Sequence, residues 1–256
     1  MENGTIEDSD ILVDEAFQLL ASFHQFIETG LNDDARLAEF GAGFDELGME
    51  EESREAFRRA LRQAPERADY HYLLGASYST SLAVALINNQ SWPEIAELAL
   101  ESFEQALRLE PSHLDAMIGA IDCLMLVDDG KRIDEIIELC RRWWEFVQGD
   151  PIKEADAIFK LSIVYYLEGR NEDAENLVSL LLEKVPEVAE PFLVKGLISF
   201  KRGEHGFLET INVLRAIDPV LAQSLLNLSQ LQTTIKYRDI ACVLMSMEVE
   251  IVGKSG

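Results

Sequence analysis

Basic residues are scarce in this sequence: its 256 residues hold 22 lysines and arginines against 47 acidic side chains, a formal charge of −25. A surface of that sign repels phosphate backbones and anionic membranes, which excludes nucleic acid as an expected direct partner. Long apolar runs and an N-terminal signal pattern are also lacking. We therefore expect a cytoplasmic protein that makes no membrane contact.

Cysteine and the usual chemical motifs are rare or missing as well. Cys123, Cys140 and Cys242 lie far apart in apolar stretches, and an odd number with wide spacing suits neither a disulfide framework nor a zinc site. The four histidines have no metal-ligand spacing, and there is no glycine-rich phosphate loop, nucleophile elbow or dinucleotide fingerprint. We expect no metal, no cofactor and no catalytic residue, so the protein is not expected to be an enzyme.

What the sequence does have is a normal globular composition, with 48% hydrophobic and 27% charged residues. Its length exceeds that of one ordinary compact domain, which favours two units or growth by repetition. The acidity is uneven along the chain, because residues 1–50 hold thirteen acids against Arg36 alone. Residues 187–256, by contrast, are nearly neutral. In an elongated molecule such a gradient becomes a polarity that a partner can recognise.

Three prolines, Pro65, Pro111 and Pro186, each end a segment with the same internal spacing of small and apolar residues. The aligned positions are Ala60, Phe57 and Ser53; Ala106, Phe103 and Ala99; and Leu181, Val178 and Ala174. This pattern resembles the tetratricopeptide repeat of about 34 residues. Two degenerate units fill the gaps, which gives repeats at about 34–65, 68–111, 114–151, 155–186 and 189–219.

Each repeat is expected to be a pair of antiparallel helices, because apolar residues recur at helical spacing. Gly41 and Gly75 would let two helices approach closely, and four glycines fall where a first helix must stop. These four are Gly48, Gly130, Gly169 and Gly203. No strand pattern competes, so the sequence predicts an all-α solenoid. The resemblance implies a superhelix whose first helices line a concave groove.

Two regions depart from the repeat. Between Tyr78 and Ala99 the second unit carries about ten extra residues, which predicts a longer first helix and a larger turn. Residues 1–33 form an acidic segment with one helical stripe, and residues 220–256 carry two more, Leu221 to Leu231 and Ile240 to Ile251. Solenoid ends need covering, so these helices are expected to cap the first and last repeats.

One family site is expected to be absent. In the resembled family, lysine, asparagine and arginine of three successive first helices grip the terminal carboxylate of heat-shock chaperones. The matching positions in this sequence are Ala38, Ala42, Leu73, Asp115 and Gly119. A heat-shock carboxylate clamp is therefore not predicted.

The second position of the first helix is acidic in four of the five repeats, at Asp69, Asp115, Asp156 and Glu190. One interpretation is that each acid complements the positive end of its helix dipole. The other is that the acids form a ladder along the groove that holds lysine or arginine of an extended partner. Both can be true together, and Asp69, Asp115 and Asp156 are taken as candidate partner-binding residues.

Further along, the positions that would face the groove become large and apolar. The candidates are Phe159, Ile163, Tyr166, Leu197 and Phe200. They predict either an exposed apolar patch that binds a partner or ordinary core, covered by a tight superhelix or by the C-terminal helix folding back.

The sequence is thus expected to encode a non-catalytic scaffold or adaptor that binds a basic and apolar segment of another protein in its groove. Two alternatives stay open, a dedicated assembly chaperone for a basic client and a regulatory subunit of an enzyme complex. The high acidity is also typical of proteins from salt-adapted sources, an explanation that needs no basic partner.

Overall fold

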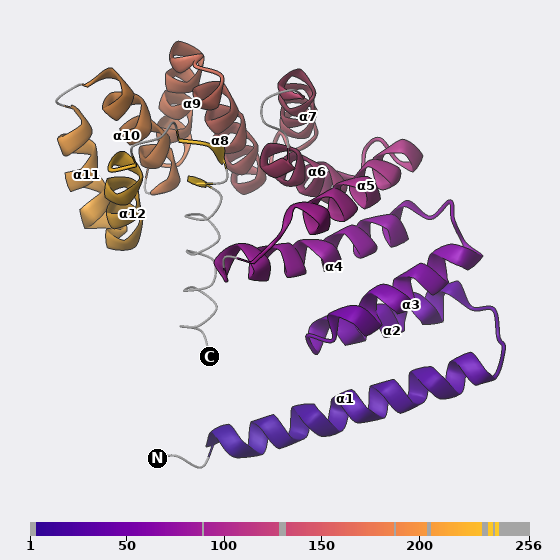
Figure 1. Ribbon diagram of the computed structural model, residues 1–256. Helices are drawn as coiled ribbons and strands as arrows, with labels where there is room; N and C mark the ends of the chain where they lie inside the picture. The colour runs from indigo at the N-terminus through magenta and orange to yellow at the C-terminus, as the bar shows by residue number, and fades with distance from the viewer. Residues whose placement is uncertain are drawn as a thin grey trace. The chain divides into compact units, whose positions relative to one another are not determined.

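The structure is a computed structural model, and it describes residues 4–88, 90–127, 132–186, 188–203, 206–231, 235–237 and 239–240. Within these ranges every long regular element is an α-helix, so the predicted all-α class is confirmed. In chain order the helices are α1 (Gly4–Glu28), α2 (Asp34–Glu46), α3 (Glu50–Gln63), α4 (Ala68–Ile87), α5 (Pro93–Leu109), α6 (Leu114–Val127), α7 (Ile133–Phe146), α8 (Pro151–Leu167), α9 (Asn171–Lys184), α10 (Glu190–Arg202), α11 (Gly206–Ile217) and α12 (Pro219–Ser229) (Figure 1).

The chain divides into two compact units. Unit 1 comprises Met1–Val84 and Trp92–Ala120, and unit 2 comprises Ala85–Ser91 and Ile121–Gly256. Helix α4 is longer than the other first helices, with 20 residues against 13 in α2 and 14 in α6. The predicted lengthening of the first helix in the second repeat is therefore confirmed.

Local sequence explains where several helices begin. Asp33, Asp150 and Asp218 precede α2, α8 and α12, and each side chain accepts hydrogen bonds from backbone amides of the first turn. Proline follows directly in α8 and α12, where its missing amide costs nothing and its fixed φ suits a helix. An aspartate followed by proline thus sets the start of two helices in unit 2.

Glycines end three of the first helices, as the sequence predicts. Gly48, Gly169 and Gly203 have φ of 69°, 76° and 67°, a left-handed conformation that glycine adopts without steric cost. Gly130, the fourth glycine of the prediction, lies outside the described residues. The sharp reversal after α2, α8 and α10 brings the following helix back alongside, and the structure packs α2 on α3, α8 on α9 and α10 on α11.

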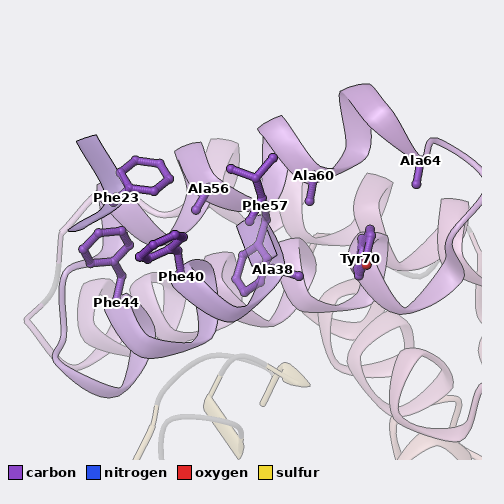
Figure 2. Close-up of a cluster of buried hydrophobic side chains, with 10 residues drawn as sticks. Phe23, Ala38, Phe40, Phe44, Ala56, Phe57, Ala60, Ala64 and Tyr70 are labelled. Carbon is purple, nitrogen blue, oxygen red and sulfur yellow. The ribbon is translucent and has the colours of Figure 1, made fainter. Parts of the chain in front are cut away.

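The core of unit 1 joins α1, α2 and α3 (Figure 2). Phe23 of α1 lies with its ring centroid 5.3 Å from that of Phe40 and 5.2 Å from that of Phe44. Between α2 and α3, a Cβ added at Gly41 would come within 2.6 Å of the Phe57 ring. The predicted close approach at this glycine is confirmed, and α1 supplies the aromatic side chain that buries the outer face of α2.

Unit 2 is built around α8 and α10. Helix α8 packs against α7, α9 and α10, and α10 also packs against α9, α11 and α12. The predicted stripe of α12 is buried at Leu221, Leu225 and Leu228, which are 0%, 0% and 5% exposed. The second C-terminal stripe, beyond Ile240, lies outside the described residues. The two central helices therefore have neighbours on several sides, which decides the burial of their apolar residues.

Candidate partner-binding site

Three carboxylates of unit 1 lie at the starts of successive first helices. Asp34 begins α2, Asp69 lies in the first turn of α4, and Asp115 lies in the first turn of α6. We call Asp34, Asp69 and Asp115 the acidic rim. Asp69 and Asp115 are exposed, and Asp34 is half-buried.

Side-chain contacts connect these helix starts. The Tyr70 hydroxyl of α4 donates to Asp34 Oδ2 of α2 over 2.8 Å, and burial, together with this contact, raises the pKa of Tyr70. His113 Nε2, just before α6, lies 3.7 Å from Asp69 Oδ1. The rings of Tyr72 and His113 are 4.9 Å apart between centroids. Tyr70 directly follows Asp69 and His113 lies two residues before Asp115, so these contacts join the starts of α2, α4 and α6.

The charge of Asp69 is only weakly neutralised by the neighbouring Arg67. Arg67 Nη2 lies 3.6 Å from Asp69 Oδ2, and the Asp69 side chain is 62% exposed. A pair this open to water contributes little, about 0–1 kcal/mol, and it is screened by salt. The carboxylates also complement the positive ends of α2, α4 and α6, so a helix-end role and a partner-binding role are physically compatible.

Asp156, the corresponding acid of unit 2, is the sixth residue of α8, because this helix begins at Pro151 and the acid of its first turn is Glu154. The expected place at the second position of a first helix is therefore wrong for Asp156. Partial desolvation of its carboxyl raises the pKa, with Lys160 acting in the opposite direction and Glu190 and Asp150 adding to the rise. Glu190 begins α10. Whether Asp156 and Glu190 act together on a partner stays a prediction.

The apolar candidates do not form one exposed patch. Ile163, Tyr166 and Leu197 are 1%, 6% and 0% exposed, which corrects the expectation that they line an open groove and selects the alternative of ordinary core. The reason is that α8 and α10 are covered on several sides, so residues 161–166 are all buried. These three side chains have no free surface to offer a partner in this conformation.

The two phenylalanines among the candidates retain some exposure. Phe159 is half-buried on α8. Phe200 is 40% exposed near the end of α10, where its ring centroid lies 5.2 Å from that of Phe207 on α11. Their role in partner binding stays a prediction.

A polar cluster in unit 2 was missed by the sequence interpretation. Asp122 Oδ1 on α6 accepts a hydrogen bond from the Tyr237 hydroxyl over 3.1 Å and also pairs with the Lys160 ammonium of α8. Burial and the Asp122 carboxylate raise the pKa of Tyr237 well above its ordinary value, and Cys140 and Cys123 lie near enough to contribute. We call Asp122, Lys160 and Tyr237 the Asp122 cluster. The sequence signal for this cluster is Asp122 itself, an acid that lies among apolar residues in the middle of α6, away from Asp115 in the first turn.

The neighbouring thiol of Cys140 is fully buried, and its burial raises the pKa to about 12. A thiol held protonated and away from solvent is a poor nucleophile and a poor metal ligand. Across the residues that the structure describes, no group of three histidine, cysteine or acidic side chains could hold a metal ion. None of the described helices is both long enough and apolar enough to span a bilayer.

Solved structures share this arrangement of helical hairpins. YrrB, described as a tetratricopeptide-repeat protein with an unusual peptide-binding site, matches with a TM-score of 0.61 and 20% identity over 80% of this chain and 98% of its own. PilW, a type IV pilus biogenesis factor, matches with a TM-score of 0.58 and 16% identity over 87% and 96%. MamA from Desulfovibrio magneticus RS-1 matches with a TM-score of 0.60 and 15% identity over 73% and 97%. The chain has the tetratricopeptide-repeat fold. No protein-family model and no curated protein matches the sequence.

The tetratricopeptide-repeat fold shows which helices correspond to one another. The first helices of its hairpins are α2, α4, α6, α8 and α10, and the acidic rim lies on three of them. Asp122 is the ninth residue of α6 and lies two turns beyond Asp115 on the same helix.

Proposed function

We propose that the chain is a non-catalytic scaffold that binds a segment of another protein, and that the acidic rim recognises lysine or arginine in that segment. The observation that carries the proposal is that side-chain contacts join the starts of three successive first helices, because Tyr70 of α4 bonds Asp34 of α2 and His113, two residues before Asp115, lies near Asp69. Its similarity in fold to YrrB, which has a peptide-binding site, supports the same function.

Charge complementarity of this kind acts mainly on the rate of association. Exposed carboxylates attract a basic segment from a distance, and salt screens that attraction within about 10 Å at 0.1 M ionic strength. Desolvated aromatic side chains usually supply more of the affinity. Phe200 is the candidate with an open ring surface in unit 2.

The experiment that tests the proposal is affinity purification of partners at low salt, followed by mass spectrometry and a binding titration with the isolated partner. The wild-type chain is compared with a variant that carries Asp34→Asn, Asp69→Asn and Asp115→Asn. Asparagine keeps an oxygen that can accept the Tyr70 hydrogen bond, so only the charge is removed.

For the triple variant we expect association with a basic partner segment to slow by about tenfold at low ionic strength, because electrostatic steering is lost. The difference should shrink as salt is added. The matched control replaces Glu94, Glu97 and Glu101 by glutamine, which changes the net charge equally on the exposed surface of α5. Stopped-flow measurement of the association rate decides the outcome, and equal rates for both triple variants would leave the acidic rim with a helix-end role only.

A further inference from the structure

The segment that follows α12 turns back to α6. Tyr237 and Ile240 are 7% and 0% exposed, so both side chains are buried within unit 2. The Tyr237 hydroxyl bonds Asp122, which is 115 positions earlier in the chain. Tyr237 therefore lies against a part of the helical array that comes much earlier in the chain.

This placement differs from that of a simple cap. Helix α12 already packs against α10 and α11, so a further capping segment would be expected to contact those two helices. Seven residues separate Ser229 from Tyr237. At about 3.3–3.6 Å per residue such a linker reaches past two helices, which are about 8–10 Å apart. The chain has enough length to carry Tyr237 from α12 back to α6.

The chemistry of the Asp122 cluster allows the segment to leave. A buried phenol needs an acceptor for its hydroxyl, and Asp122 provides it. When Tyr237 leaves, Asp122 still has the Lys160 ammonium, so no buried charge is left without a partner. The side chains of Asp122 and Lys160 are 34% and 20% exposed, which shows that water already reaches the pair.

We propose that Tyr237 is an intramolecular ligand of the surface that Asp122 and Lys160 form on α6 and α8, and that a partner segment binds there only by displacing it. This inference rests on the proposed function, because it assigns to the same scaffold a second partner-binding surface, in unit 2, and a contact that regulates access to it. The partner segment that fits carries a hydrogen-bond donor that replaces the Tyr237 hydroxyl at Asp122.

A tethered ligand competes strongly, because a short linker gives it an effective concentration that is roughly millimolar. The test therefore uses the full chain and a labelled synthetic peptide with the sequence of residues 235–240, Ile-Lys-Tyr-Arg-Asp-Ile. Fluorescence anisotropy compares its binding to the wild-type chain, to Tyr237→Ala and to Leu231→Ala. Leu231 is 43% exposed in the same C-terminal stretch and serves as the matched control.

We expect the peptide to bind Tyr237→Ala at least about tenfold more tightly than the wild type, because the competing ligand has been weakened. Leu231→Ala should behave like the wild type. A second peptide with phenylalanine in place of tyrosine should bind Tyr237→Ala about threefold to tenfold more weakly than the first, since it has no hydroxyl for Asp122. Circular dichroism checks that Tyr237→Ala is folded. If it is not, Tyr237→Phe replaces it; because this variant keeps the ring, the peptide should gain less affinity for it than is expected for a folded alanine variant.

Equal peptide affinities for the wild type and both Tyr237 variants, or no binding to any of them, would overturn the inference. Failure of the proposed function looks different. If a partner segment binds the wild type and Tyr237→Ala equally well, Tyr237 does not compete with that segment, and the scaffold function still stands. If the peptide binds Tyr237→Ala while neither form of the chain binds any partner segment, the intramolecular contact stands and the scaffold function fails.

Discussion

Replacing Leu197 by alanine is expected to lower the free energy of unfolding by about 2–5 kcal/mol. Leu197 is 0% exposed on α10, and its neighbours Val194 and Ile198 are 0% and 1% exposed. Because α10 packs against helices on several sides, the space left by the missing side chain cannot close by a small local shift. Urea unfolding followed by circular dichroism measures the loss.

The control for Leu197 is Phe200, which lies one turn further along α10 and is 40% exposed. Phe200→Ala should cost much less stability, because part of its ring is already in water. If Phe200 is the partner anchor, the same change should weaken partner binding by about 2 kcal/mol. A Leu197→Ala variant as stable as the wild type, with weakened binding instead, would return Leu197 to the partner surface and contradict its burial.

The hairpin architecture was predictable from the sequence because its signals are local. Prolines, small residues and turn glycines recur at fixed spacing, and each acts within one hairpin. Gly48, Gly169 and Gly203 have the left-handed conformation that their places in the repeat require. The long α4 was predictable for the same reason, since the extra residues lie within one repeat.

The candidate site was less predictable because burial is decided by distant neighbours. Ile163 and Leu197 recur at helical spacing, and an apolar residue in that pattern can face either a partner or the core. What covers them is the packing of α8 and α10 among other helices. Tyr237 was missed for a related reason: its acceptor Asp122 is 115 positions away, and no local pattern links the two. The contacts around the acidic rim are easier to predict, because they join residues of neighbouring repeats, which lie closer together in the sequence.

The second large effect is expected at Phe103 of α5, where alanine should cost about 3–5 kcal/mol of unfolding free energy. The ring is 2% exposed and fills the space left by glycines on two flanking helices. A Cβ added at Gly119 of α6 would come within 2.4 Å of the ring, and one added at Gly75 of α4 would come within 2.8 Å. One aromatic side chain thus joins α4, α5 and α6 in unit 1.

The same geometry predicts a reversal of sign at Gly119. In the wild type, Gly119→Ala should destabilise the chain by about 1–3 kcal/mol, because the new methyl group overlaps a ring that has no room to move. In a Phe103→Ala background the overlap is gone, and the same change should instead stabilise α6 by up to about 1 kcal/mol through helix propensity. Urea unfolding of the two single variants and the double variant gives the coupling energy. Gly43→Ala on α2 is the control, since its nearest neighbour is the flexible end of Leu19 at 3.1 Å. Stabilisation by Gly119→Ala in both backgrounds would show that the ring does not lie against α6.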